Sequence, residues 1–173
     1  MSDIIVQKFG GTSVGSDERI AAVAQIIKKA KKDNQIIVVV SAMSGETYRL
    51  INLAKSFGDN PDRREFDALI STGEKVSASL LAMALNSIGV KAKSFSASQI
   101  SMKTTDQHSK AKIIDVDGEK ILLTLEEDVV PIITGFQGVT ESGDVTTLGR
   151  GGSDTTAVAI AAHVNASRCD IYT

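Results

Sequence analysis

Cysteine is nearly absent from this sequence, which has one, Cys169, among 173 residues. A single cysteine excludes a disulfide within the chain and any metal site built from several cysteines. An excess of one charge is missing as well, because 19 lysine and arginine residues balance 21 aspartate and glutamate residues. That balance provides no electrostatic basis for binding nucleic acid or an anionic membrane. The low cysteine content favours a cytoplasmic location.

Long hydrophobic runs are also lacking. The longest apolar stretches, such as Ile36–Val40, are far too short to cross a bilayer. Residues 1–3 lead directly into a short apolar run, without the basic region and long hydrophobic stretch of a signal peptide. We therefore expect neither a membrane span nor a secretion signal. The composition, with 42% hydrophobic and 23% charged residues, is that of one soluble globular domain with a buried core.

The order of the apolar segments predicts an α/β fold with a mainly parallel sheet between helices. Ile4–Phe9 and Ile36–Val40 have the length and β-branched content of strands, and between them Ser16 is a helix N-cap. Further helices are predicted after Thr47, over Arg64–Ser87 with an interruption near Gly73, and over Glu119–Glu127 and Ser153–Ala166. Further strands are predicted over Ala92–Ser96, Lys112–Val116, Val130–Thr134 and Cys169–Tyr172, with a hairpin over Val139–Thr147.

The last predicted strand coincides with the end of the chain. In parallel-sheet domains, ligand sites lie in the loops that follow the strands. A chain that stops at Thr173 lacks one such loop. We therefore expect the sequence to be a fragment of a longer protein.

A glycine-rich segment, Gly10–Gly15, connects the first strand to the first helix. Glycines let backbone N–H groups close around an anion, and the helix N-terminus and Lys8 add positive potential. These features suit the phosphates of a nucleotide, although a tight turn beside a solvated lysine explains them almost as well. A Walker loop does not match, because Ser16 and Asp17 stand where it has Lys and Ser/Thr.

A second glycine-rich segment, Thr146–Thr156, leads into another predicted helix. Ser153 and Asp154 could simply be the N-cap and first-turn acid of that helix. Arg150, which has glycines on both sides, is harder to explain by packing. Its guanidinium has the geometry to bind a carboxylate or a phosphate through two hydrogen bonds.

A third candidate segment, Ser41–Thr47, directly follows a buried strand, where open parallel sheets bind their ligands. Thr47 could equally be a helix N-cap. Glu74, which follows Ser71-Thr72-Gly73, would by itself more often be a solvated side chain. No metal site is predicted, because neither His108 nor His163 has a partner at metal-ligand spacing.

Five motifs of this sequence resemble those of the amino acid kinase family and occur in the same order. They are Lys8-Phe9-Gly10-Gly11-Thr12-Ser13-Val14, Val40-Ser41-Ala42-Met43, Ser71-Thr72-Gly73-Glu74, Gly135-Phe136-Gln137-Gly138 and Thr147-Leu148-Gly149-Arg150-Gly151-Gly152-Ser153-Asp154. The resemblance covers essentially all 173 residues and, within the family, is to the catalytic domain of the aspartate kinases. It implies a carbamate kinase-like fold, of which residues 1–173 form the N-terminal portion. The rest of the kinase domain and the regulatory domains would be absent.

The resemblance also implies an activity, the ATP-dependent phosphorylation of the side-chain carboxylate of L-aspartate to 4-phospho-L-aspartate. That reaction is the first step towards lysine, threonine and methionine. Lys8 and Asp154 would be catalytic, Lys8 contacting the transferring phosphoryl group and Asp154 ordering Lys8. ATP, with Mg²⁺, would be bound by Lys8, Gly10, Gly11, Ser13 and Thr173. Aspartate would be bound by Ser41, Thr47, Glu74, Arg150, Gly152 and Ser153, and the full-length form would be a homo-oligomer.

Two alternatives stay open. A related kinase could phosphorylate glutamate, carbamate or a nucleotide, although Arg150 with Glu74 favours an amino acid zwitterion. The chain could instead be a non-catalytic fragment that binds nucleotide or substrate. In the family, a loop beyond the residue equivalent to Thr173 helps to hold adenine. Whether residues 1–173 alone bind ATP is therefore the property that distinguishes a catalytic domain from a non-catalytic fragment.

Overall fold

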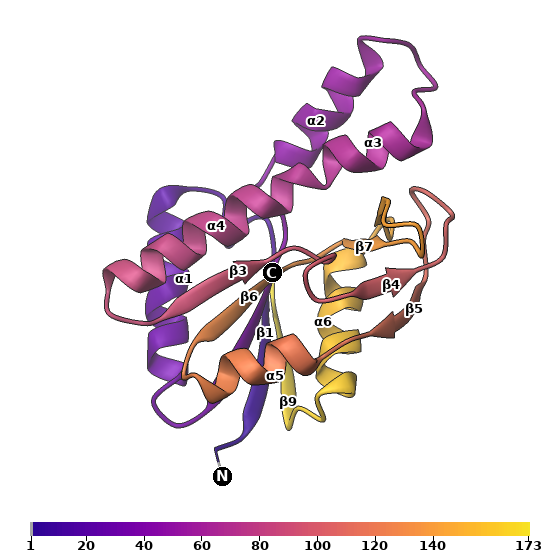
Figure 1. Cartoon of the computed structure of the whole chain (residues 1–173). Coiled ribbons are helices and arrows are strands. Elements are labelled where there is room, and N and C mark those ends of the chain that lie inside the picture. The colour runs from indigo at the N-terminus through magenta and orange to yellow at the C-terminus, as the bar shows by residue number, and fades with distance from the viewer. Residues whose placement is uncertain (1) are drawn as a thin grey trace.

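The centre of the computed structural model, which describes residues 2–173, is a parallel sheet. Its strands are β1 (Ile4–Phe9), β2 (Gln35–Val40), β3 (Ala92–Phe95), β6 (Val130–Thr134) and β9 (Arg168–Tyr172). They are arranged in the order β3-β6-β2-β1-β9, and every neighbouring pair is parallel (Figure 1). The most apolar strands, β1, β2 and β6, occupy the buried middle of the sheet. The predicted fold class is confirmed, and the carboxyl ends of all five strands meet at one edge.

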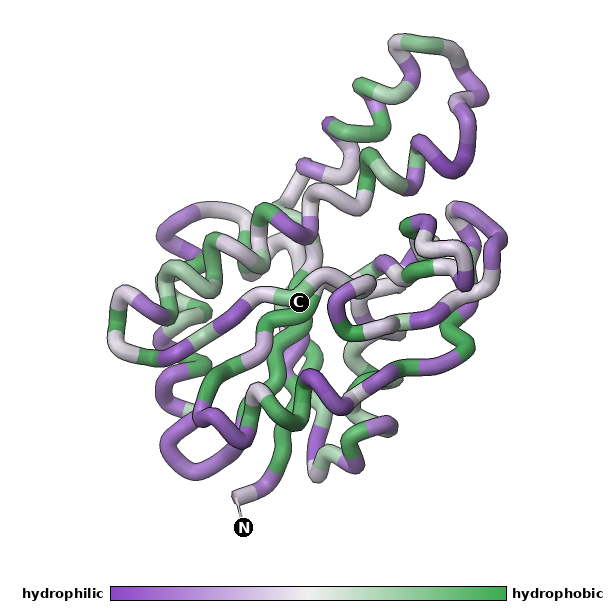
Figure 2. Tube along the Cα trace, viewed as in Figure 1, coloured by the Kyte–Doolittle hydropathy of each residue, from purple (hydrophilic) through white to green (hydrophobic). Residues whose placement is uncertain are grey.

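Helices cover both faces of this sheet. α1 (Asp17–Ala30) and α4 (Thr72–Ser87) pack on one face, and α5 (Glu119–Glu126) and α6 (Gly152–His163) pack on the other (Figure 1). The two resulting hydrophobic cores share the strands, where Figure 2 shows the apolar residues concentrated. α1 begins as predicted, because the Ser16 hydroxyl accepts a hydrogen bond from the backbone N–H of Arg19 at 3.2 Å.

Two further helices, α2 (Glu46–Lys55) and α3 (Arg63–Ile70), project from the body of the molecule as a pair (Figure 1). α3 is separated from α4 at Ser71, two residues before the predicted interruption. Within residues 2–173, the stretch Arg63–Ser87 is the one that is long and apolar enough to span a membrane by length and composition. Half of its most apolar window is buried inside the structure, as in a core helix.

A second, four-stranded sheet lies beside α6. It consists of β4 (Met102–Thr104), β5 (Ile113–Val116), β7 (Gln137–Val139) and β8 (Val145–Thr147), in the order β5-β4-β7-β8. The predicted hairpin is confirmed as the antiparallel pair β7–β8. β4 was not predicted, because three residues are too short for alternation of polar and apolar side chains to be recognised.

The structure excludes the two alternative N-cap roles that the sequence left open. α2 and α6 begin after Gly45 and Gly151, which both have positive φ angles, so neither Thr47 nor Ser153 is an N-cap. A glycine at this position reaches the left-handed conformation that other residues avoid. Cys169 is half-buried because β9 is an edge strand.

Candidate functional site

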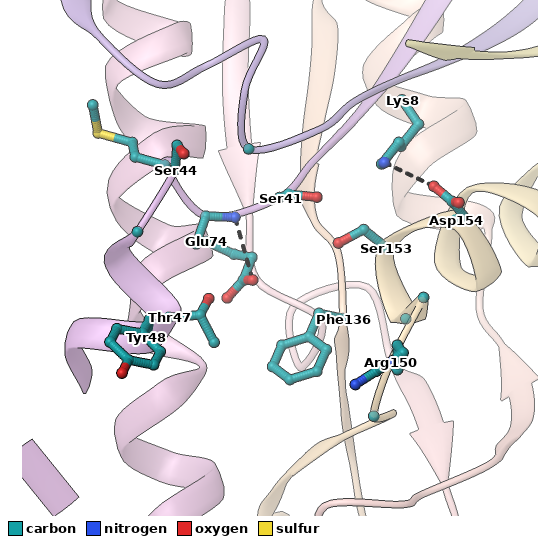
Figure 3. A pocket seen from close by; sticks show the side chains of 17 residues that line it. Lys8, Ser41, Ser44, Thr47, Tyr48, Glu74, Phe136, Arg150, Ser153 and Asp154 are labelled. Atoms are coloured by element: carbon teal, nitrogen blue, oxygen red, sulfur yellow. Dashed lines mark hydrogen bonds and ion pairs between the residues drawn. The ribbon is translucent and has the colours of Figure 1, made fainter. Parts of the chain in front are cut away.

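A cleft of about 480 Å³ opens at the edge of the sheet where the strands end (Figure 3). The loops after β1, β2 and β6 and the first turns of α2, α4 and α6 surround it. It brings together most of the residues predicted from the sequence, namely Lys8, Gly11, Ser41, Thr47, Glu74, Arg150, Gly152, Ser153 and Asp154. These residues come from segments separated by up to 146 positions, and only the parallel topology places them at one edge.

The other predicted residues lie beside this cleft and do not line it. The backbone N–H of Gly10 donates to the carbonyl of Tyr172 at 3.0 Å, and the Ser13 hydroxyl donates to the carbonyl of Thr173 at 2.8 Å. The glycine-rich loop is therefore held against the end of β9, next to Lys8. The predicted phosphate-binding residues thus form a group adjacent to the cleft.

Lys8 is the buried cation of the site. Its ammonium lies 2.7 Å from Asp154 Oδ1, and its side chain is only 10% exposed, whereas that of Asp154 is 52% exposed (Figure 3). A buried ammonium without a partner would be costly, so the ion pair with Asp154 offsets the burial of Lys8 and holds its ammonium in place. Asp154 lies in the first turn of α6, where the helix dipole also favours a carboxylate.

Glu74 is the buried acid of the site, in the first turn of α4 and 2% exposed. Its Oε1 accepts a hydrogen bond from the backbone N–H of Ala42 at 3.3 Å, while Oε2 has no partner (Figure 3). Burial raises the pKa of Glu74 from 4.5 to about 8, although the backbone N–H groups of Glu74 and Ala42 oppose the shift. A buried carboxylate oxygen without a partner, lining a cleft, suits a positively charged ligand group.

Close packing between α4 and the loop after β2 determines where Glu74 lies. A Cβ atom at Gly73 would be 2.8 Å from the Cβ of Ala42, so a larger residue does not fit there. The Ser77 hydroxyl donates to the carbonyl of Ser41 at 2.6 Å, one helical turn further along. The glycine in Ser71-Thr72-Gly73-Glu74 is therefore required for packing, and it brings Glu74 beneath the loop.

Arg150 is the exposed cation of the site. It lies between Gly149 and Gly151, whose φ angles are +85° and +74°, at the start of α6. No hydrogen bond or ion pair within residues 2–173 uses its guanidinium, which is free to bind a ligand. α2 and α6 both lack a side-chain N-cap, so backbone N–H groups at their first turns remain for an anion.

Sequence reasoning missed Asp67 in α3, which has 0% exposure. Its carboxylate accepts from the backbone N–H and hydroxyl groups of both Ser109 and Thr147, and it pairs with His108 Nδ1 at 2.8 Å. His108 is therefore a half-buried partner of Asp67. The network ties α3 to the end of β8, three residues before Arg150. An acid in a helix ordinarily indicates a solvated face, and no sequence signal distinguishes this one.

Two aromatic residues that line the cleft were also not predicted as site residues. Phe136, in the motif Gly135-Phe136-Gln137-Gly138, has a positive φ angle of 74° and lines the cleft. Tyr48 is 71% exposed at the rim. Among residues 2–173 there is no group of three or more His, Cys, Asp or Glu side chains that could hold a metal ion.

Comparison with known proteins places these features in context. The profile of the amino acid kinase family matches residues 3–173. The chain is 54% identical over 171 residues to an aspartokinase of Geobacillus stearothermophilus and to an aspartate kinase of Pseudomonas putida, covering 98% of this chain and 42% of each relative. It therefore spans less than half the length of these curated relatives.

Solved structures show the same similarity. The aspartate kinase of Synechocystis superposes with a TM-score of 0.82 at 47% identity, covering 98% of this chain and 28% of that one. The Escherichia coli aspartokinase III in complex with aspartate and ADP superposes with a TM-score of 0.89 at 27% identity, covering 99% of this chain and 49% of that one.

Proposed function

The chain belongs to the amino acid kinase family, and on that premise we propose that it forms the N-terminal portion of a catalytic domain that phosphorylates L-aspartate with ATP. The product is 4-phospho-L-aspartate, which leads towards lysine, threonine and methionine. The observation that carries the proposal is the buried Glu74 carboxylate with an unpartnered oxygen, in a cleft that also contains Lys8 and Arg150. The names of the relatives, aspartokinase and aspartate kinase, support the same substrate.

The charges of the cleft match those of the amino acid. Glu74 Oε2 would accept a hydrogen bond from the α-ammonium, and the free guanidinium of Arg150 would hold the α-carboxylate through two hydrogen bonds. The hydroxyls of Ser41, Thr47 and Ser153, with the backbone of Gly152, lie in the same cleft and supply donors and acceptors. Placing both charged groups in this way leaves the side-chain carboxylate of aspartate to point towards Lys8.

The reaction needs positioning and charge neutralisation more than proton transfer. An aspartate side chain has a pKa of about 3.9, so the nucleophile is ionised at neutral pH and needs no general base. One of its oxygens forms a bond to the γ-phosphorus of ATP as the bond from that phosphorus to the β,γ-bridging oxygen breaks and ADP leaves. Lys8 stabilises the charge on the phosphoryl oxygens, and Asp154 holds Lys8 in the required position.

The ATP phosphates would lie on the loop of Gly10, Gly11 and Ser13, beside Thr173. This loop and the first turn of α6 converge near Lys8, which agrees with binding of an anion. Mg²⁺ typically neutralises phosphate charge in such transfers. The described residues 2–173 offer no cluster of ligands for it, so we assign no protein ligand to the metal. A cytoplasmic location and a homo-oligomeric full-length form remain proposals.

The test is an aspartate-dependent assay in which hydroxylamine traps the acyl phosphate formed with Mg-ATP. The chain is compared with Lys8→Ala and with Lys29→Ala, which removes an exposed lysine of α1 as a matched control. We expect product from the chain and from Lys29→Ala, and none from Lys8→Ala. Product that persists in Lys8→Ala would refute the role of Lys8.

Aspartate binding measured by calorimetry separates the remaining readings. If the folded chain makes no product but binds aspartate, and Glu74→Gln abolishes that binding, residues 1–173 are a substrate-binding portion and catalysis by them alone is refuted. If glutamate is phosphorylated in preference to aspartate, the substrate assignment is wrong. If neither amino acid binds, the assignment of the cleft is wrong.

A further inference from the structure

A second pocket, of about 330 Å³, lies between α4 and the ends of β3 and β6. Its lining residues include Lys75, Ser79, Ser94, Gln99 and Thr134. Glu74 lines the cleft described above and its neighbour Lys75 lines this pocket, so the first turns of α4 separate the two. None of these residues belongs to the proposed aspartate or ATP sites.

At the bottom of the pocket, β6 presents a polar side chain, Thr134, on a face of the strand that is otherwise apolar. Side chains alternate between the faces of a strand, so Thr134 lies on the same face as Ile132, which is part of the core beneath α1 and α4. Thr134 is 1% exposed and its hydroxyl has no hydrogen-bond partner. A valine of the same shape would fill this position without an unsatisfied group, so the hydroxyl is unexplained by packing.

Several further side chains of the pocket have donor groups without partners, whereas the Ser96 hydroxyl is paired with Ser98 and with Gln99 Oε1. No hydrogen bond or ion pair within residues 2–173 uses the side chains of Lys75, Ser79 or Ser94. Gln99 accepts at Oε1 from the backbone N–H of Ser96 at 2.8 Å, which leaves its amide NH₂ to donate. Lys75 is the one charged residue among the described residues that line the pocket.

From this donor set we propose that the pocket binds a small oxyanion, a phosphate or a carboxylate group. Lys75, in the first turn of α4, provides the charge. The Gln99 amide and the hydroxyls of Ser79, Ser94 and Thr134 provide hydrogen bonds, and no lining carboxylate repels the anion. A cation is disfavoured for the same reason. This site does not depend on the proposed phosphoryl transfer.

The test is a titration of the ¹⁵N-labelled chain with sodium phosphate, and separately with sodium acetate, against sodium chloride of equal ionic strength. We expect saturable shifts of the backbone amides of Lys75, Ser94 and Gln99. Lys75→Met should raise the Kd for the anion at least about tenfold, equivalent to about 1.4 kcal/mol. Thr134→Val should raise the Kd severalfold without unfolding the chain. Lys93→Met, an exposed lysine on the other face of β3, should leave the Kd within about twofold.

Phosphate can also bind beside Lys8, so Lys8→Ala is titrated in parallel. Shifts around the pocket that survive in Lys8→Ala and weaken in Lys75→Met support the site. Shifts with phosphate alone assign a tetrahedral oxyanion, and shifts with acetate as well assign carboxylates too. Shifts confined to Gly10–Gly15 that vanish in Lys8→Ala, an unchanged Kd in Lys75→Met, or shifts that do not saturate overturn the proposal.

Discussion

Replacing Glu74 by glutamine should make the unfolding free energy of this chain less dependent on pH. Burial raises the pKa of Glu74 from 4.5 to about 8, so the unfolded chain releases this proton at a lower pH than the folded chain does. Between these values the folded state binds more protons than the unfolded state. Stability is therefore highest below pH 4.5 as far as this group is concerned, and it falls as the pH rises towards 8.

The size of the effect follows from the same pKa values. Relative to its value at low pH, the unfolding free energy is lowered by Glu74 by about 2 kcal/mol at pH 6 and by about 5 kcal/mol at pH 9, where the effect levels off. Glutamine resembles the protonated acid at every pH. The difference in unfolding free energy between Glu74→Gln and the parent chain should therefore grow by about 2 to 3 kcal/mol from pH 6 to pH 9, in favour of the variant.

Urea unfolding of both chains at pH 6, 7, 8 and 9, followed by circular dichroism, measures this difference. Glu46→Gln is the matched control, because Glu46 is a first-turn glutamate of α2 that is paired with Arg49. The pKa of Glu46 is lowered, chiefly by the hydrogen bond from Arg49. Glu46→Gln should therefore not produce a gain in unfolding free energy that grows above pH 6. A difference between Glu74→Gln and the parent that is constant with pH would refute the reasoning, since it would mean that Glu74 is ionised at little cost.

Other properties should respond in defined ways. Aspartate affinity should rise about tenfold per pH unit from pH 6 towards 8, because the proposed ligand ammonium requires ionised Glu74, and calorimetry that finds no such slope would contradict the pairing. Asp67→Asn should lower the unfolding free energy by about 2 kcal/mol or more and weaken aspartate binding, because the new amide NH₂ would face donors that the carboxylate now accepts from. Denaturation and calorimetry on one preparation measure the two effects. A change in unfolding free energy below about 0.5 kcal/mol would contradict the prediction. Gly73→Ala should cost about 1 to 3 kcal/mol through the contact with Ala42, and an unchanged melting temperature would show that α4 shifts freely.

Much of the fold was predictable because its elements are locally encoded. Ile36–Val40 is continuously apolar, so it could only be a strand buried on both faces, and Ser16 shows the start of α1. β4 was not predictable, because its three residues become a strand only through pairing with β5 and β7. The exact starts of α2 and α6 depended on left-handed glycines, Gly45 and Gly151, whose conformation is a property of the packed loops.

The sequence alone determined the chemistry that is available to this protein: the glycine-rich loops, the arginine between glycines and the motif order that resembles a kinase family. Those are features of residue type and spacing, and they do not depend on how the chain folds. Only the tertiary structure decided which residues share an environment. Glu74 has a raised pKa because α4 buries it under Ala42. Asp67 accepts hydrogen bonds at the end of β8, next to the loop of Arg150, because α3 packs against a strand 80 residues further along the chain. Burial and electrostatic coupling depend on distance in space, which a linear pattern does not contain.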